Sequence, residues 1–301
     1  MYPPSLVDYQ PIVCRPALPK DTPGMFELTR WIWEGDDYVP DVWEAWLADT
    51  QGILAVAEWK GKVVGFAKLT KLSAGDWWME GLRVHPKFEG NRIASRLHGY
   101  LLEFWQRYGS GVLRLATSSA REPVKHLSRK WGFETIGEYS IYKSEKTVDN
   151  FIDAQHSPFQ RFTLEDIPDA ITWLKDPQKD RLPFGIMDLG WQFAEPKEEY
   201  FVAYLQGNQA WWWEGQQGIL LMVDKKDGEE TWARIRMLAC DREKLAELLH
   251  AVRKFTNQSG YAGVNWMAPM LPGMEEVLVS TGFKRDWEGS LLIFEKRQAQ
   301  G

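Results

Sequence analysis

Residues 77–108 are WWMEGLRVHPKFEGNRIASRLHGYLLEFWQRY. The first part ends on Leu82 and Val84 with alternating apolar residues, which predicts a strand, and a proline then stops it. From Ile93 onward, apolar residues recur at helical period, so we expect a helix with one face against a sheet. Gly90 loosens the loop between them. This order predicts an anion site, because the first N–H groups of a helix lack internal acceptors and carry the positive end of its dipole.

The order of residues in this loop indicates which anion is expected to bind. Residues 89–94, Glu-Gly-Asn-Arg-Ile-Ala, follow an apolar-x-Val-x-Pro strand end. They resemble the acetyl-coenzyme A loop of the GNAT superfamily of N-acetyltransferases, R/Q-x-x-G-x-G/A. Ala94 fits this pattern, whereas Glu89 and Arg92 depart from it. An arginine in place of the central glycine restricts how closely the backbone approaches a pyrophosphate, unless it has ordinary helical dihedral angles. Its guanidinium can instead bind a phosphate.

The resemblance implies that acetyl-coenzyme A donates an acetyl group directly to an amine, without a metal. Its pantetheine arm would pair with the backbone of the strand, and an N–H near Leu82 would stabilise the developing oxyanion. The residues that the resemblance places on the acyl donor are Leu82, Arg83, Val84, Glu89, Gly90, Asn91, Arg92, Ile93, Ala94 and Ser95.

Length, charge and cysteine content limit the classes of protein to consider. The 301 residues suffice for two domains. A net charge of -6 has the wrong sign for a nucleic-acid surface, so we expect no nucleic-acid partner. Cys14 and Cys240 are far apart and indicate free thiols in a reducing compartment. No apolar stretch has the length of a membrane span, so we expect a cytoplasmic protein that does not bind membranes.

The second half of the chain repeats the pattern of the first. Each half is predicted to open with a strand, helices and antiparallel strands, and each ends with a Gly-Phe pair before a closing strand. We therefore expect an α+β fold of two tandem GNAT domains, each a mixed, mostly antiparallel sheet flanked by helices. The predicted boundaries are 1–148 for the domain with the acetyl-coenzyme A loop, 149–159 for a linker and 160–301 for a degenerate copy.

The two copies differ where the anion site is expected. In the second copy only Ala239-Cys240-Asp241-Arg242 connects strand and helix, with neither glycine nor proline. We therefore assign acetyl-coenzyme A to the first copy alone. Because single-domain relatives pair, the tandem is expected to be a pseudo-dimeric monomer or a homodimer.

Acetyl transfer to an amine needs a base, since an amine of pKa near ~10 is protonated at neutral pH. Glu80 is the candidate, because strand alternation puts it on the face of Leu82 and Val84 unless a bulge shifts the register. The alternative is a surface carboxylate paired with an arginine. In the family, the acid that protonates the departing thiolate is commonly a tyrosine. The resemblance places Ser128 at the position of that tyrosine. Other candidates for this acid are His126, Ser118, Ser119, Tyr139 and Tyr142.

The acceptor is expected to contact the acidic turn around Asp36, Asp37 and Tyr38, where a carboxylate would bind a cationic group. The alternative is a solvated turn that caps a helix. The stretch 32–40 is similar to histidine N-acetyltransferase relatives, which favours a free amino acid or other small amine. The predicted function is an N-acetyltransferase for such an amine. The alternatives are a non-catalytic acyl-coenzyme A sensor and an interaction module that binds no ligand.

Overall fold

The computed structural model describes residues 12–146 and 157–298. The chain forms two compact units that interleave in the sequence. The first comprises Met1–Ala116, Pro123–Glu134 and Phe294–Gly301, and the second comprises Thr117–Glu122 and Thr135–Ile293. The boundaries 1–148 and 160–301 stay a prediction for the two domain copies. Positions 149–156 of the predicted linker lie outside the described residues, and Phe159 begins a strand.

The first unit holds a mixed, mostly antiparallel sheet. Its strands follow the order β1, β2, β3, β4 and β5, with β15 next to β5, and only the β4–β5 pair among its first five strands is parallel. The elements are β1 Val13–Pro16, η1 Pro19–Asp21, α1 Thr22–Thr29, η2 Trp33–Gly35, α2 Val39–Ala48, β2 Ile53–Trp59, β3 Lys62–Ser73, β4 Asp76–Val84, η3 Pro86–Phe88, α3 Ile93–Tyr108, β5 Val112–Ser118, α4 Glu122–Lys130 and β15 Leu291–Arg297.

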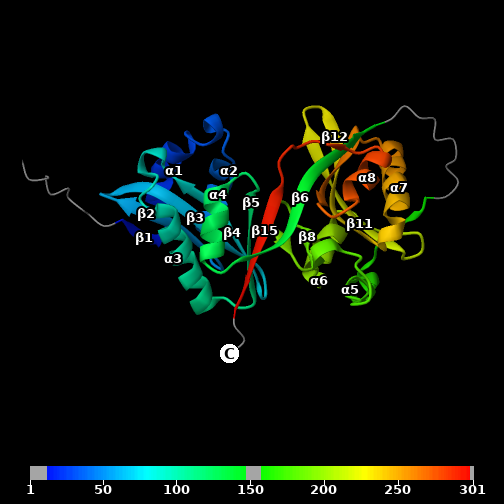
Figure 1. Ribbon diagram of the computed structural model, residues 1–301, viewed down its shortest axis with the longest axis horizontal. Helices are drawn as coiled ribbons and strands as arrows, with labels where there is room; N and C mark the ends of the chain where they lie inside the picture. The colour runs from blue at the N-terminus through cyan, green and yellow to red at the C-terminus, as the bar shows by residue number, and fades with distance from the viewer. Residues whose placement is uncertain (1–11, 147–156, 299–301) are drawn as a thin grey trace, which may run out of the picture. The chain divides into compact units, whose positions relative to one another are not determined.

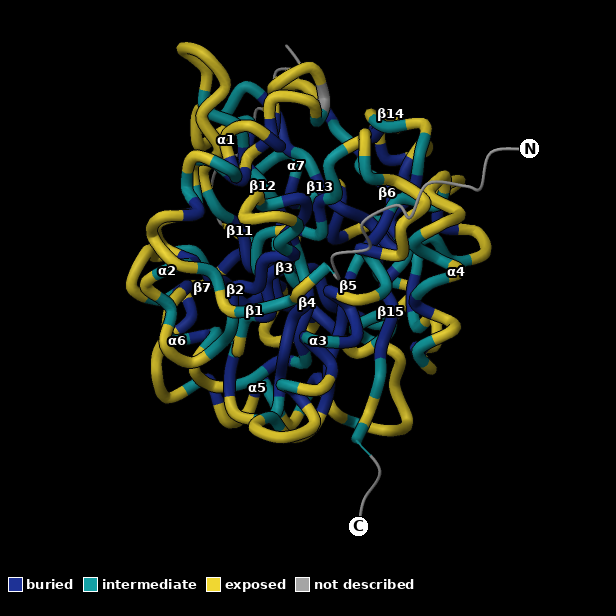
Figure 2. Tube along the Cα trace, turned by 90° about the vertical axis from the view of Figure 1, so that its left-hand side faces the viewer, coloured by how far each residue is buried: buried dark blue, intermediate teal, exposed yellow. Residues whose placement is uncertain are grey.

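Helices cover both faces of this sheet (Figure 1). Helices α1 and α2 share a core with one face, in which Trp43 packs edge-on against Phe66 of β3. On the other face, α3 lies so close that a Cβ on Gly65 would be 2.9 Å from Ile93 Cγ2. The expected apolar stripe of α3 is buried at Ile93, Leu97 and Leu101. Figure 2 shows the strands largely buried and the connecting loops exposed.

The second unit repeats this plan. Its strands follow the order β6, β13, β12, β11, β10 and β7, and β12–β13 is the parallel pair. In β10, Trp211 and Trp213 enter one hydrophobic core and Trp212 enters the other, so consecutive tryptophans lie on opposite faces of the sheet. The elements are β6 Glu134–Glu145, β7 Phe159–Arg161, η4 Leu164–Asp166, α5 Ile167–Leu174, η5 Pro183–Gly185, β8 Met187–Asp188, β9 Phe193–Ala194, α6 Glu198–Gln206, β10 Ala210–Trp213, β11 Gly218–Asp227, β12 Glu230–Cys240, η6 Arg242–Lys244, α7 Leu245–Gln258, β13 Gly263–Pro269, α8 Met274–Ser280 and β14 Lys284–Arg285.

The closing strands are exchanged between the two halves of the chain. We expected the strand within 134–146 to close the first copy and the strand near 290–296 to close the second. The structure corrects this, because β6 pairs with β13 over seven residues in the second unit, while β15 follows β5 in the first. A strand's own pattern shows which face is buried but does not identify its neighbour.

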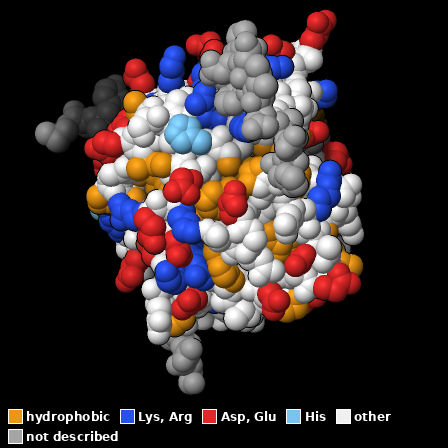
Figure 3. Space-filling model, turned by 90° about the vertical axis from the view of Figure 1, so that its right-hand side faces the viewer, with side chains coloured by type: hydrophobic (Ala, Val, Ile, Leu, Met, Phe, Trp, Pro, Cys, Tyr) orange, Lys and Arg blue, Asp and Glu red, His pale blue; other side chains and the backbone are white. Residues whose placement is uncertain are grey.

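The surface of the second unit that faces the viewer in Figure 3 carries interspersed acidic and basic side chains. Within residues 12–146 and 157–298, no helix combines the length and apolar character needed to cross a membrane.

Candidate functional site

Strand β4 contains a β-bulge at the centre of the predicted site. Lys68 of β3 pairs with Glu80, and Phe66 pairs with Arg83, so β4 has one more residue than β3 between these pairs. Gly81 adopts a φ of 66° there, and a side chain in its place would collide with the ring of Trp46. The bulge therefore needs glycine, and it leaves the residue after it outside the regular ladder.

The bulge reverses the face that we expected for Glu80. Lys68 and Phe66 are two residues apart on β3 and share a face, so their partners Glu80 and Arg83 also share it. Val84 pairs with Gly65 on the opposite face, next to α3. The exception that we named, a bulge that shifts the register, is therefore present, and Glu80 lies on the side covered by α1 and α2 and not on the face of Val84.

Strands β4 and β5 separate beside the bulge. Their parallel register joins Asp76 to Val112 and ends with Met79 opposite Leu115, although β4 continues to Val84. We call this separation of the two strands a fork. Past the last pair, the β4–β5 register leaves the end of β4 without β5 as its partner, and an extended ligand can pair there as another strand.

The loop after β4 leads directly to the N-terminus of α3. Gly90 has a φ of 81°, and a Cβ added there would meet no heavy atom within 4 Å, so the space beside the loop is open. The Asn91 side chain donates to the carbonyl oxygens of Phe88 at 3.0 Å and Glu89 at 3.3 Å, which fixes the loop. Helix α3 has no side-chain N-cap bond. The N–H groups at Ile93, Ala94 and Ser95 thus begin an uncapped helix that suits an anion.

Arg92 has a backbone conformation that favours glycine. Its φ of 59° and ψ of 21° lie in the left-handed region, whereas we considered ordinary helical angles. This conformation costs an L-residue about 1–2 kcal/mol. The side chain is exposed, as is that of Glu89 three residues earlier. Neither of the two residues that depart from the family pattern thus fills the space beside the loop with a buried side chain.

Glu80 is half-buried and held from β3. The Thr70 hydroxyl donates to Glu80 Oε1 at 2.7 Å. The ammonium of Lys68, on the strand directly opposite, bonds to the Asp49 carboxylate and to the carbonyl oxygen of Leu69 at 2.9 Å. Burial lowers the pKa of Lys68, and the carboxylates of Asp49 and Glu80 oppose that change. Sequence reasoning missed Thr70 and Lys68, although a lysine amid the apolar residues of β3 was a usable signal.

The acidic turn is divided between a buried and an exposed carboxylate. Asp37 accepts two hydrogen bonds from Arg83, at 2.8 Å from Nε and 3.0 Å from Nη2. It also accepts the N–H of Val39 at 3.2 Å, so it ties the turn to β4. Asp36 is exposed, and the ring of Tyr38 lies beneath the Arg83 guanidinium. The structure thus brings Asp37, Tyr38 and Arg83 together and leaves Asp36 facing solvent.

Ser128 lies on α4 with its hydroxyl directed into the helix. Its side chain is buried, and Oγ donates to the Val124 carbonyl oxygen at 2.9 Å. This bond directs its proton to the helix backbone. Among the other candidate acids, His126 is an exposed residue of α4. The second unit contains the remaining four candidates, Ser118, Ser119, Tyr139 and Tyr142.

The second unit has the same fork, but the chain itself fills it. Register between β12 and β13 ends at Ile235 and Trp266, and Arg236 is a bulge residue of β12. Beyond the bulge, the N–H of Cys240 donates to the carbonyl oxygen of Arg181 at 3.2 Å. A segment of the chain therefore occupies the backbone edge that is open on β4.

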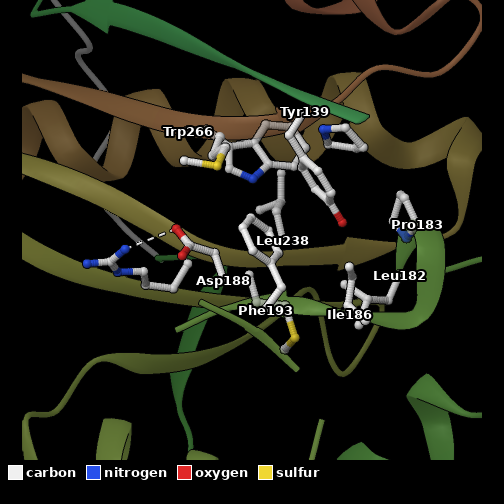
Figure 4. Close-up of a pocket in the computed structure, with 12 residues that line it drawn as sticks. Tyr139, Leu182, Pro183, Ile186, Asp188, Phe193, Leu238 and Trp266 are labelled. Carbon is white, nitrogen blue, oxygen red and sulfur yellow. Dashed lines mark hydrogen bonds and ion pairs between the residues drawn. The ribbon is translucent and has the colours of Figure 1, made fainter. Parts of the chain in front are cut away.

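The remaining space in this second fork is small. Figure 4 shows Leu182 and Ile186 beside Leu238, with Trp266 and Tyr139 above it. They border a cavity of about 20 Å³, which has room for about one water molecule. At its edge Arg236 and Asp188 form an ion pair at 3.0 Å.

The start of α7 also differs from the start of α3. Asp241 precedes it and accepts from Lys179 Nζ and Arg181 Nε, each at 2.8 Å. A carboxylate with two cationic partners therefore stands where the first unit has an open glycine loop.

Comparison with known proteins agrees with this geometry. Residues 22–133 match the model of the acetyltransferase (GNAT) family. An uncharacterized protein of Mycobacterium leprae is 28% identical over 153 residues, which are 50% of this chain and 42% of that protein. A histidine N-acetyltransferase of Oreochromis niloticus is 32% identical over 89 residues, 29% of this chain and 25% of that enzyme. These matches cover less than half of either relative.

A solved structure extends the likeness to the whole chain. The tandem GNAT protein from the clavulanic acid biosynthesis pathway superposes with a TM-score of 0.58 and 14% identity, over 97% of this chain and all of that one. Residues 22–133 thus match the GNAT acetyltransferase family, and the chain as a whole has the fold of two tandem GNAT domains.

Proposed function

We propose that this chain is an N-acetyltransferase whose first unit moves the acetyl group of acetyl-coenzyme A to a primary amine of a small molecule. The observation that carries the proposal is the fork beside the β4 bulge, which opens next to the uncapped N-terminus of α3. An extended arm on β4 and a pyrophosphate at α3 fit these two features together. The residues on the acyl donor are those of β4 after the bulge and of 89–95.

Glu80 is proposed to accept the proton that the amine loses on attack. It is the carboxylate that stands on β4 immediately before the bulge, and Thr70 already fixes one of its oxygens. A backbone N–H near Leu82, within the bulge, is proposed to stabilise the oxyanion, a contribution of ~3–4 kcal/mol in other acyl-transfer sites. The thiolate is proposed to leave without an acid from α4, since the Ser128 hydroxyl is bonded to Val124.

The acceptor is proposed to be a free amino acid or a related small amine. The match to a histidine N-acetyltransferase supports this class. Asp36 is proposed to bind a cationic group of the acceptor, with Tyr38 beside it, and Asp37 to hold the turn in place through Arg83. We also propose that the protein is cytoplasmic and has no nucleic-acid or membrane partner. Its proposed oligomeric state is a pseudo-dimeric monomer or a homodimer.

The first experiment is a calorimetric titration of acetyl-coenzyme A into the wild type and into A94W. The indole should block the first turn of α3, so binding by the wild type and none by the variant locates the donor. A panel of amines with detection of free thiol then tests transfer, and E80Q should lower kcat by about 100-fold or more. Failure of the wild type to bind acetyl-coenzyme A would contradict the proposal.

A second candidate is a non-catalytic sensor of acyl-coenzyme A. The observation in its favour is that Ser128 replaces the family's tyrosine and that its proton is bonded to Val124. A sensor would bind acetyl-coenzyme A at the same fork and release no thiol with any amine, so the amine panel separates the two functions.

A further inference from the structure

Two polar residues of β3, Lys68 and Thr70, lie next to Glu80. Lys68 lies directly opposite Glu80 in the register, and its side chain is 1% exposed. Thr70 is two residues further along the same face and bonds to Glu80 Oε1 at 2.7 Å. A lysine this deeply buried is costly unless its charge is paired, and an apolar side chain would fill the same place at lower cost.

The surroundings of Glu80 are rich in charge. From β4 and the turn before α2, Arg83 and Asp37 form a two-bond ion pair, and Tyr38 lies against Arg83. From the end of α2, Asp49 pairs with Lys68. Each cation near Glu80 therefore already has a carboxylate partner. Removing the Lys68 ammonium would take away an attraction and also leave the charge of Asp49 uncompensated, so both effects would favour protonation of Glu80.

We propose that Thr70 and Lys68 are positioning residues for the proton transfer, Thr70 by fixing the orientation of the Glu80 carboxylate and Lys68 by keeping it ionised. This inference rests on the proposed role of Glu80 as the base. Thr70 acts through a directed hydrogen bond, whose loss lets the carboxylate rotate away from the attacking amine. Lys68 acts through its charge, whose loss raises the pH at which Glu80 becomes a base.

The chain offers a matched control for each residue. T70V removes the hydroxyl and keeps the shape, whereas T70S keeps the hydroxyl. K68M removes the buried charge, and K71M removes the same charge from an exposed position on the same strand. All four are compared with the wild type by kcat and KM for acetyl transfer across pH, with thermal melts to confirm folding.

We expect T70V to lower kcat by about 10-fold with the KM for acetyl-coenzyme A unchanged, and T70S to stay within about twofold of the wild type. We expect K68M to move the acidic limb of the kcat/KM profile upward by roughly one pH unit, and K71M to leave it in place. A loss of activity without a change in the pH profile would show that Lys68 has only a structural role.

Different experimental results would overturn the positioning role of Thr70 and Lys68 and the proposed function. If the wild type transfers acetyl groups and E80Q does not, but T70V matches T70S and the K68M profile matches the wild type, the positioning role is overturned and the enzyme stands. If the wild type binds acetyl-coenzyme A and acetylates no amine, the proposed function fails and this inference fails with it. Should K68M not fold, the T70V and T70S pair decides.

Discussion

Glu295 of β15 accepts a hydrogen bond from Nε of Arg114 of β5 at 2.8 Å, and the two residues are 181 positions apart in the chain. Arg114 also donates to Asp76 of β4 at 2.7 Å, and its side chain is 1% exposed. This buried cluster ties the last strand of the chain into the sheet that contains the candidate site.

Replacing Arg114 by leucine should therefore destabilise the first unit by about 3–5 kcal/mol, because two buried carboxylates lose their cation. Denaturant unfolding measures the effect. The control is R297A, which removes an exposed partner of the same Glu295 and should cost less than about 1 kcal/mol. Equal effects of the two changes would contradict the account of the cluster.

The two aspartates of the acidic turn should behave differently. D36N removes an exposed charge and should raise the acceptor KM while leaving unfolding within about 0.5 kcal/mol of the wild type. D37N breaks the buried pair with Arg83 and should cost about 2–4 kcal/mol in stability. Steady-state kinetics and denaturant unfolding of both variants separate the roles, and an unchanged KM in D36N would refute the proposed acceptor contact.

The left-handed conformation of Arg92 should reverse the usual order of glycine and alanine. At this position R92G should be more stable than R92A by about 1 kcal/mol, because glycine tolerates a positive φ. One turn later, R96G should instead be less stable than R96A by about 1 kcal/mol, since Arg96 is inside the helix. Chemical unfolding of the four variants checks the reversal, which a helical Arg92 would not produce.

The buried imidazole of His98 should make stability fall in mild acid. It lies against Trp131 and Phe133, and burial lowers its pKa to about 4 from an ordinary value of 6.5. Between these two pH values the unfolded chain binds a proton that the native state does not, so stability decreases as pH falls from 6.5 toward 4. The full loss is about 3 kcal/mol.

Unfolding free energies measured from pH 7 to pH 4.5 test this dependence. H98F should flatten the curve in that range, whereas H126Q, at an exposed position of α4, should keep it. A wild-type curve as flat as that of H98F would mean that the imidazole titrates equally in both states.

The filled fork of the second unit predicts the binding stoichiometry. Because Arg181 occupies the edge of β12 and Asp241 precedes α7, calorimetry should find one acetyl-coenzyme A per chain. A94W should abolish that one site. Two sites per chain, or a site that persists in A94W, would show that the second fork opens.

Local patterns in the sequence predicted most elements, because helical and strand periods are properties of neighbouring residues. The strand that ends at Val84 and the helix that begins at Ile93 lie where the sequence predicted them. The hairpin β8–β9 was missed, since two-residue strands have no visible period. The ion pair of Asp37 with Arg83 joins residues that are 46 positions apart, so no local sequence pattern predicts it.

The sequence predicted a site made of the loop, the start of α3 and Glu80, and these roles stay a prediction. The face of Glu80 depended on a bulge. Gly81 was the available signal, because a lone glycine inside a strand often marks one. Whether a bulge forms there depends on Trp46, which packs over Gly81 from α2.

The exchange of closing strands has a consequence for synthesis in the cell. The first unit contains residues from Phe294 onward, so its sheet is incomplete while the ribosome is still adding the second half. The first unit thus cannot finish folding before its last strand, β15, has left the ribosome. A messenger truncated anywhere in the second half would yield a nascent chain whose donor loop is present in sequence but whose sheet lacks its last strand.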